Sequence, residues 1–207
     1  MRTEIETKLE LRSKEIYELL LNSCRQKTRL EQLNVYYDHA GQLAEQAATF
    51  RLRYQVNARI ELTLKIPMSN EAGCRSAIEI EESYTRWRKP AQTLTVSTDL
   101  APSFQQYLGE LGLSVLERIG AMRTSRIVLE LIDGIEIELD KITLPDGSTV
   151  YEVEIENVDP TIHEFAMTEI KRITSEFNLS KESKYQRFMR VVTSRKSIVQ
   201  SQNSIRA

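Results

Sequence analysis

The chain has 207 residues, with 28 basic and 30 acidic side chains and a net charge of −2. This length allows one domain with its own core, and an apolar content of 41% excludes a wholly disordered chain. The absence of a basic excess argues against a nucleic-acid binder, and no apolar run is long enough for a transmembrane helix.

The first third of the chain alternates apolar and charged residues with period two, which is typical of strands. Residues 3–11 (TEIETKLEL) are the first such segment. Ser13 then provides an N-cap for a helix from Lys14 to about Cys24, with apolar residues on one face. Three further strands are predicted at 32–38 (QLNVYYD), 49–54 (TFRLRY) and 60–66 (IELTLKI).

The middle of the chain begins with proline, glycine and small polar residues, which predict an irregular loop from Pro67 to Ala77. A strand follows at 77–83 (AIEIEES). Pro102 or Ser103 opens a helix that ends near Gly112, and the alternation returns in a strand at 126–131 (RIVLEL).

Two hairpin turns are predicted in the last third, at 132–134 (IDG) and 145–147 (PDG). They connect the strand at 126–131 to further strands at 134–142 and 151–157. Asp159 and Pro160 then give an N-cap and a first-turn proline, and they start a helix to about Phe177. The apolar stripe of this helix predicts packing against the core or against a second copy in a homodimer.

A shorter helix is predicted from Ser183 to Val192, and the polar residues 193–207 are expected to be a weakly ordered tail. We therefore predict an α+β fold that is mainly antiparallel β, with eight strands and several flanking helices. Residues 1–192 would form a single domain.

The charged residues of the strands are sorted by sign. Acidic residues occupy positions 4, 6, 79, 81, 138, 140, 152 and 154, whereas positions 51, 53, 65 and 126 are basic. A sheet with one solvated face shows the same alternation, but eight strands are also about enough to close a barrel. If the charged face pointed inward, one wall would bind divalent cations and the other a polyanion. Periodicity alone does not decide between these arrangements.

The opening strand reads Glu4-Ile5-Glu6-Thr7-Lys8, an E-x-E-x-K motif. After it come, in order, QLNVYYD, FRLRY, LTLKIP, AIEIEES, RTSR, IELD, YEVEIE and SKYQRF. This series resembles the CYTH family, named for class IV adenylate cyclase and thiamine triphosphatase, within the triphosphate tunnel metalloenzymes. The resemblance runs from residue 4 to about 190, and it implies an eight-stranded closed tunnel whose ionisable side chains point inward.

The resemblance also implies which residues would form a site. The metal ligands, for Mg²⁺ or Mn²⁺, would be Glu4, Glu6, Glu79, Glu81, Asp140, Glu152 and Glu154. The phosphates would be bound by Lys8, Arg51, Arg53, Lys65, Arg126 and Lys184, with Lys181 and Arg187 as alternatives to Lys184. The residues expected to be catalytic are Glu4, Glu6, Lys8, Arg51 and Arg53. Glu138 and Glu156 extend the acidic strands, so either could replace an assigned ligand.

The activity implied by the resemblance is metal-dependent hydrolysis of the terminal phosphoanhydride of inorganic triphosphate, or of a related triphosphate such as thiamine triphosphate. The alternative is a class IV-like adenylate cyclase that converts ATP to cyclic AMP and pyrophosphate. A domain that binds polyphosphate without catalysis is a third hypothesis. We find no adenine-binding motif, which favours the inorganic substrate. The charged N-terminus and the two cysteines, Cys24 and Cys74, predict a cytoplasmic protein that does not associate with membranes.

Overall fold

The computed structural model describes residues 2–55, 60–71, 74–84, 89–132, 134–156, 159–180 and 182–204. Its long strands are β1 (Arg2–Leu11), β2 (Arg25–Asp38), β3 (Thr49–Gln55), β4 (Ile60–Glu71), β5 (Cys74–Tyr84), β7 (Val115–Ile132), β8 (Ile135–Thr143) and β9 (Thr149–Glu156). These eight antiparallel strands pair in the order β1-β5-β4-β3-β2-β7-β8-β9, and β9 pairs with β1 to close a barrel. The predicted fold class is confirmed.

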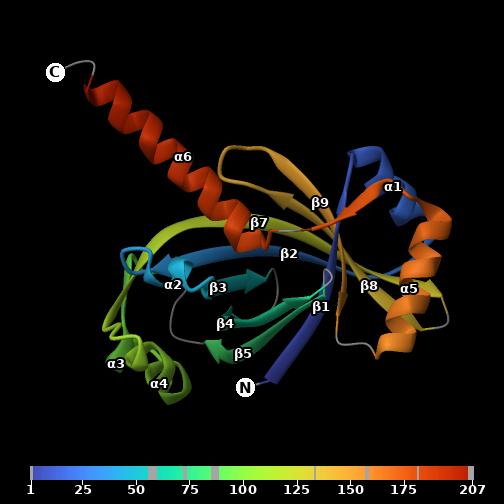
Figure 1. Ribbon diagram of the computed structural model, residues 1–207. Coiled ribbons are helices and arrows are strands. Elements are labelled where there is room, and N and C mark those ends of the chain that lie inside the picture. The colour runs from blue at the N-terminus through green and yellow to red at the C-terminus, as the bar shows by residue number, and fades with distance from the viewer. Residues whose placement is uncertain are drawn as a thin grey trace.

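Two short strands and six helices surround the barrel in the described part of the chain. Strand β6 (Thr93–Thr95) pairs with β7, and β10 (Phe177–Leu179) pairs with β1. The helices are α1 (Lys14–Ser23), α2 (Gln42–Glu45), α3 (Val96–Asp99), α4 (Pro102–Glu110), α5 (Pro160–Ile173) and α6 (Lys184–Ser204). Helices α1 and α5 lie together at one side of the barrel, whereas α6 starts at the barrel and projects away from it (Figure 1). None of the helices in the described residues is both long and apolar enough to cross a membrane.

The apolar face of the strands points outward, toward the helices. On one side, Phe50 of β3 and Leu64 of β4 are fully buried in a cluster with Phe104 of α4. On the other side, Leu139 of β8 is buried in a second cluster with Ile170 of α5 and residues of α1. Because successive side chains of a strand point to opposite faces, this packing turns the charged residues into the interior of the barrel. Of the two arrangements that periodicity left open, a sheet with one solvated face and a barrel with a charged interior, the structure has the barrel.

A third apolar cluster fixes the start of α6 on the barrel. Tyr185 and Phe188 of α6 pack against Tyr36 of β2, with ring centroids 5.3 and 4.7 Å from that of Tyr36. The backbone of Gly120 in β7 approaches Phe188 so closely that a β-carbon there would lie 2.8 Å from the ring. Glycine at this position lets the first turn of α6 lie against the barrel.

The structure corrects the loop predicted at 67–77. Strand β4 continues to Glu71 and β5 begins at Cys74, with residues 72–73 outside the described part. Beyond Lys65, β4 pairs with β5 and no longer with β3. The missing N–H of Pro67 therefore costs no hydrogen bond on the side of β4 that faces β3. A register shift between Pro67 and Ser69 takes up the irregularity.

Other predicted boundaries differ less. Strands β2 and β7 begin at Arg25 and Val115, several residues before the segments predicted from alternation, and the short elements α2, α3, β6 and β10 were not predicted. The turn at 145–147 is confirmed by a hydrogen bond from the Gly147 amide to the Leu144 carbonyl, whereas Asp133 of the other predicted turn lies outside the described residues. Helix α6 continues to Ser204, past the predicted end at Val192. The division of the chain into a domain of 1–192 and a tail stays a prediction.

The N-cap predicted for α5 is present, and it yields a stability prediction. The Asp159 carboxylate accepts hydrogen bonds from the amides of Thr161 and Ile162, at 2.8 and 3.1 Å. Asp159→Ala should lower the free energy of unfolding by about 1 kcal/mol, measured by urea denaturation. Glu164→Ala, at an exposed position of the same helix, is the control and should change it by less than about 0.5 kcal/mol. Equal losses in the two variants would contradict a capping role.

Candidate active site

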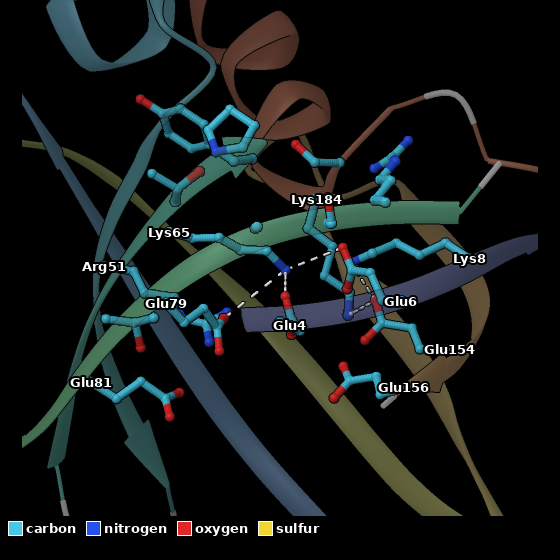
Figure 2. Close-up of a pocket in the computed structure, with 18 of the residues that line it drawn as sticks. Glu4, Glu6, Lys8, Arg51, Lys65, Glu79, Glu81, Glu154, Glu156 and Lys184 are labelled. Atoms are coloured by element: carbon cyan, nitrogen blue, oxygen red, sulfur yellow. Dashed lines mark hydrogen bonds and ion pairs between the residues drawn. The ribbon is translucent and has the colours of Figure 1, made fainter. Parts of the chain in front are cut away.

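The barrel encloses a cavity of about 560 Å³, lined by side chains from all eight barrel strands and from α6 (Figure 2). Most of the residues predicted for the site line this cavity: Glu4, Glu6, Lys8, Arg51, Arg53, Lys65, Glu79, Glu81, Arg126, Glu154 and Lys184. Asp140 and Glu152 do not line it. The sequence pattern thus places nearly all of the expected ionisable groups around one space.

Two groups of three carboxylates in the described residues are close enough to share a metal ion. One consists of Glu4, Glu6 and Glu156, and the other of Glu138, Glu154 and Glu156. In each group the candidate ligand oxygens lie within 4.8 Å of one another. The pairing of strands explains these groups, because Glu6 lies opposite Glu156 in β1–β9 and Glu138 lies opposite Glu154 in β8–β9. Glu156 belongs to both groups.

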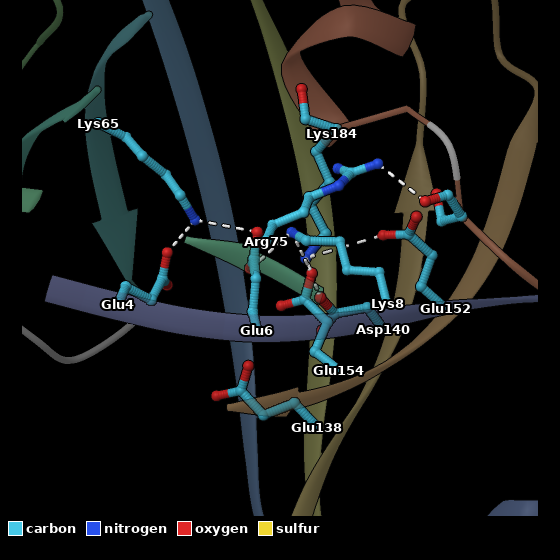
Figure 3. A network of polar contacts seen from close by, with 12 residues as sticks. Glu4, Glu6, Lys8, Lys65, Arg75, Glu138, Asp140, Glu152, Glu154 and Lys184 are labelled. Carbon is cyan, nitrogen blue, oxygen red and sulfur yellow. Dashed lines mark hydrogen bonds and ion pairs between the residues drawn. The ribbon is translucent and has the colours of Figure 1, made fainter. Parts of the chain in front are cut away.

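Asp140 and Glu152 are fully buried and are paired with cations (Figure 3). Asp140 accepts hydrogen bonds from Nε and Nη2 of Arg126, at 2.9 and 2.7 Å, and also from Lys184. Glu152 pairs with Arg187 of α6, which is itself buried. Asp140 therefore holds Arg126 and Lys184 in place at the cavity wall, and Glu152 holds Arg187 behind it. Neither carboxylate belongs to a three-carboxylate group.

Glu79 and Glu81 lie at the end of the cavity where β1 begins. Arg2, whose side chain is 54% exposed, approaches them with N–O distances of 2.9 and 3.4 Å. Burial, together with the carboxylates of Glu79 and Glu61, raises the pKa of Glu81. Glu79 and Glu81, which were predicted to bind metal, thus lie in the cavity but outside the two three-carboxylate groups.

The carboxylates of β9 differ strongly in how readily they ionise. Burial opposes the charge of Glu154, but Lys184, Lys8 and Arg126 outweigh it and hold the pKa of Glu154 well below its usual range. Burial raises the pKa of Glu156 to about 8, and the neighbouring carboxylates of Glu154 and Glu138 contribute to this shift. Glu156 has too little positive charge around it, which is the environment that a cation would relieve.

The cationic side chains of the cavity are of two kinds. Most are already paired with carboxylates: Lys8 lies 2.6 Å from Glu154, and Lys65 forms ion pairs with Glu4 and Glu6. Arg51 makes no ion pair or hydrogen bond with any described residue, and its Nε is buried without a partner. An unpaired guanidinium in a buried cavity favours the entry of an anion.

Arg53 is oriented by a neutral hydrogen-bond partner and by a longer ion pair, from its Nη1 to Glu61 at 3.8 Å. Its Nε donates to the Asn34 side-chain oxygen at 3.0 Å, and the Asn34 amide reaches Thr124 at 3.4 Å. Burial lowers the pKa of Arg53 to about 10, and the neighbouring Arg51 and Arg126 contribute. Arg53 stays charged at neutral pH, and its guanidinium is fixed toward the cavity before any ligand binds.

Several residues of the site were missed or left undecided by the sequence analysis. Glu156 appeared there only as a possible replacement, although the E-x-E-x-E run of β9 gave a signal for it. Arg75 of β5 also lines the cavity, and it was hidden because its segment was predicted to be a loop. Arg187, an alternative to Lys184 in the sequence, does not line the cavity and pairs instead with Glu152, 35 residues away. Lys181, the other alternative, lies outside the described residues.

Comparisons with known proteins agree with this architecture. The family model for the CYTH domain matches residues 2–189. A comparison with curated proteins finds no match. A solved structure of a candidate adenylyl cyclase from Hippeastrum, reported to have a dominant triphosphatase activity, is 23% identical, with a TM-score of 0.73 over 89% of this chain and 94% of that one. A candidate adenylate cyclase from Bacillus halodurans is 26% identical, with a TM-score of 0.66 over 91% of this chain and 99% of that one.

Proposed function

The chain belongs to the CYTH domain family, and from this membership and the charged cavity we propose that it is a metal-dependent triphosphatase whose substrate is inorganic triphosphate. The observation that carries the proposal is the composition of the cavity: two three-carboxylate groups share it with Arg51, which has no ion pair among the described residues. The activity reported for the Hippeastrum protein is a reason to test triphosphate first.

The carboxylate groups fit a hard divalent cation. Their donors are all oxygens, which Mg²⁺ and Mn²⁺ prefer. Burial and the neighbouring carboxylates of Glu154 and Glu138, which raise the pKa of Glu156, also favour a cation at this position. We propose Glu4, Glu6, Glu138, Glu154 and Glu156 as the residues that hold the metal. A bound divalent cation would polarise a phosphoryl oxygen and lower the pKa of a bound water.

The basic residues of the chain would bind and stabilise the substrate. Arg51 and Arg53 can donate in bidentate fashion to phosphate oxygens. Lys8, Lys65, Arg126 and Lys184 would add positive charge around the phosphates in this buried space, where electrostatic stabilisation is strong. In the reaction, the water oxygen bonds to the terminal phosphorus and the bridging P–O bond breaks, with its electron pair going to the pyrophosphate oxygen. The attacking water loses a proton to solvent, and pyrophosphate and phosphate leave. These residues stabilise the charge that shifts to the leaving oxygen.

The remaining predicted ligands have other proposed roles. Asp140 and Glu152 would position Arg126, Lys184 and Arg187, because they contact those cations. Glu79 and Glu81 lie by Arg2 at the start of β1, where they would repel free anions from one end of the cavity.

A product assay tests the proposal. With Mg²⁺ or Mn²⁺, we expect the protein to release one phosphate from each inorganic triphosphate, and EDTA to stop the release. The same samples are then given thiamine triphosphate and ATP, and the products are separated by ion-exchange chromatography. Formation of cyclic AMP and pyrophosphate from ATP as the faster reaction would support a cyclase instead. Binding of triphosphate without turnover with either metal would contradict the proposed catalysis.

A further inference from the structure

Asp38, the last residue of β2, has a buried carboxylate that forms no ion pair with any residue the structure describes. Its Oδ1 accepts hydrogen bonds from the amides of His39 and Leu43, at 2.7 and 2.9 Å. Its Oδ2 accepts from the amide of Ala44 and from the hydroxyl of Tyr185, both at 3.2 Å. A buried carboxylate without a cation is costly, and these four donors offset the cost. Asp38 therefore joins two segments of the chain through neutral partners.

The first of these segments is the connection between β2 and β3, which contains α2. Two of its residues have a left-handed backbone, Ala40 with a φ of 52° and Ala47 with a φ of 54°. This backbone conformation is unfavourable for a residue that has a β-carbon, so the connection needs other contacts to keep its shape. Asp38 supplies such contacts at the start of α2, and Ala47 and Thr49 at its other end line the cavity.

The second segment is the start of α6, where residues 183–186 line the cavity. The ring of Tyr185 packs against that of Tyr36, and its hydroxyl is the group that reaches Asp38. Burial raises the pKa of Tyr185, and the charge of Asp38 adds to the shift. The hydroxyl therefore stays protonated and donates to the carboxylate. This hydrogen bond connects α6 directly to the end of β2.

Lys184, the neighbour of Tyr185, is the charged residue of this turn that contacts the proposed site. Its Nζ donates to Glu154 at 2.8 Å and forms an ion pair with Asp140. Those two carboxylates lie on β9 and β8, which are separated from β2 by β7. A lysine has a flexible stem of four carbons, so the position of its ammonium depends on where its backbone is held. The turn is thus fixed from two sides of the barrel, and Asp38 provides the side on β2.

We propose that Asp38 is a positioning residue: by accepting the hydrogen bond from Tyr185, it fixes the first turn of α6 and so directs Lys184 toward the substrate. The inference rests on the proposed triphosphatase function and deepens it. Asp38 does not line the cavity, so it acts through Tyr185 and the backbone of α6. The carboxylate keeps the α2 connection and the α6 turn, two separate parts of the cavity wall, in a constant relation to each other.

A double-mutant cycle tests the inference. Its variants are Tyr185→Phe, which keeps the packed ring and removes only the hydroxyl, Lys184→Met, and both changes together. With Mn²⁺, Tyr185→Phe should lower kcat/KM for inorganic triphosphate about tenfold, because Lys184 is no longer held in position. In the Lys184→Met background, the same change should cost less than about twofold, because no ammonium is left to position. The matched control is Tyr107→Phe, at a partly buried tyrosine of α4, which should change kcat/KM by less than about twofold.

Three further measurements separate positioning from a structural role. The Kd for triphosphate is determined by calorimetry in EDTA for every member of the cycle, and it should follow the same non-additive pattern as kcat/KM. Hydrogen exchange of the Arg187 amide, which bonds to the Ser183 carbonyl at 3.1 Å, should be faster in Tyr185→Phe than in wild type. Asp38→Asn can still donate to the phenol oxygen of Tyr185, so it should lose less kcat/KM than Asp38→Ala. Tyr185→Phe decides the question even if Asp38→Ala does not fold.

Two results would overturn the inference. One is a lower thermal midpoint for Tyr185→Phe with the Kd and kcat/KM of Tyr107→Phe, which would make the contact with Asp38 purely structural. The other is an equal loss from Tyr185→Phe with and without Lys184, which would show that the hydroxyl does not act through that lysine. If wild type binds triphosphate without hydrolysing it, the proposed function fails, whereas the cycle measured on the Kd still decides the role of Asp38.

Discussion

Glu156→Gln is expected to lower metal-dependent hydrolysis of inorganic triphosphate roughly 10³-fold, which corresponds to about 4 kcal/mol of lost transition-state stabilisation. Glu156 is the only residue common to both three-carboxylate groups of the described structure, so its replacement removes one oxygen ligand from each. Because burial, with Glu154 and Glu138, raises the pKa of Glu156 to about 8, its side chain is mostly protonated at neutral pH without metal. Glutamine resembles that neutral form, so the variant should fold normally.

Glu152→Gln is the matched control for this experiment. It makes the same chemical change on the same strand, at a carboxylate that pairs with Arg187. We expect its apparent affinity for Mn²⁺, measured by the metal dependence of turnover and by electron paramagnetic resonance, to change less than tenfold, while its stability falls. The reverse pattern, with Glu152→Gln inactive and Glu156→Gln active, would show that Glu152 and Glu154, and not Glu156, are the metal ligands of β9.

Arg126→Met is expected to destabilise the metal-free protein by about 3–5 kcal/mol, the usual effect of removing one partner from a buried ionic group. Arg126 is buried among three carboxylates: it donates to Asp140 and Glu154 and forms an ion pair with Glu138. Without the guanidinium, these carboxylates face one another with too little positive charge. Arg123→Met, on the exposed side of the same strand, should change stability by less than about 0.5 kcal/mol. Urea denaturation in EDTA measures both.

The defect of Arg126→Met should shrink as the pH falls from 8 to 5. In wild type, burial opposes the charge of Asp140, but Arg126 and Lys184 outweigh burial and lower the pKa of Asp140. The pKa of Glu154 is lowered in the same way, by Lys184, Lys8 and Arg126. The stability that these pairs contribute is present above the unfolded pKa, roughly 4, and is lost at lower pH. Removal of Arg126 raises the folded pKa values, so protonation relieves the variant already near pH 5. A loss of stability that stays constant from pH 8 to 5 would contradict the idea that unpaired carboxylates cause it.

The strands of the barrel were predictable because their alternation is strong, but the side of the sheet that faces inward was not. The charged faces of β1, β3, β4 and β9 would look the same on a solvated sheet. What turns them inward is the packing of the other face against helices distant in the chain, such as Leu139 against α5. Only the order of motifs along the chain, compared with a known family, pointed to the lumen.

The choice among neighbouring carboxylates also lay beyond the sequence. Glu152, Glu154 and Glu156 share one face of β9, so alternation treats them as equivalent. Their surroundings differ because of strand register and α6: Glu156 lies opposite Glu6, whereas Glu152 contacts Arg187. Arg75 was missed for a local reason, since Pro67 and the small residues after it resemble a loop although β4 and β5 continue through most of that segment.

The outward packing of the apolar residues means that this enzyme fold has its hydrophobic cores outside the wall rather than at its centre. Alternate residues of one strand therefore serve the outer core and the cavity: Phe50 and Leu52 anchor β3 in the core, while Arg51 and Arg53 line the cavity. A change at an inward position without an ion pair among the described residues, such as Arg51, would leave both outer cores intact, whereas a change at a paired position such as Arg126 would also cost stability.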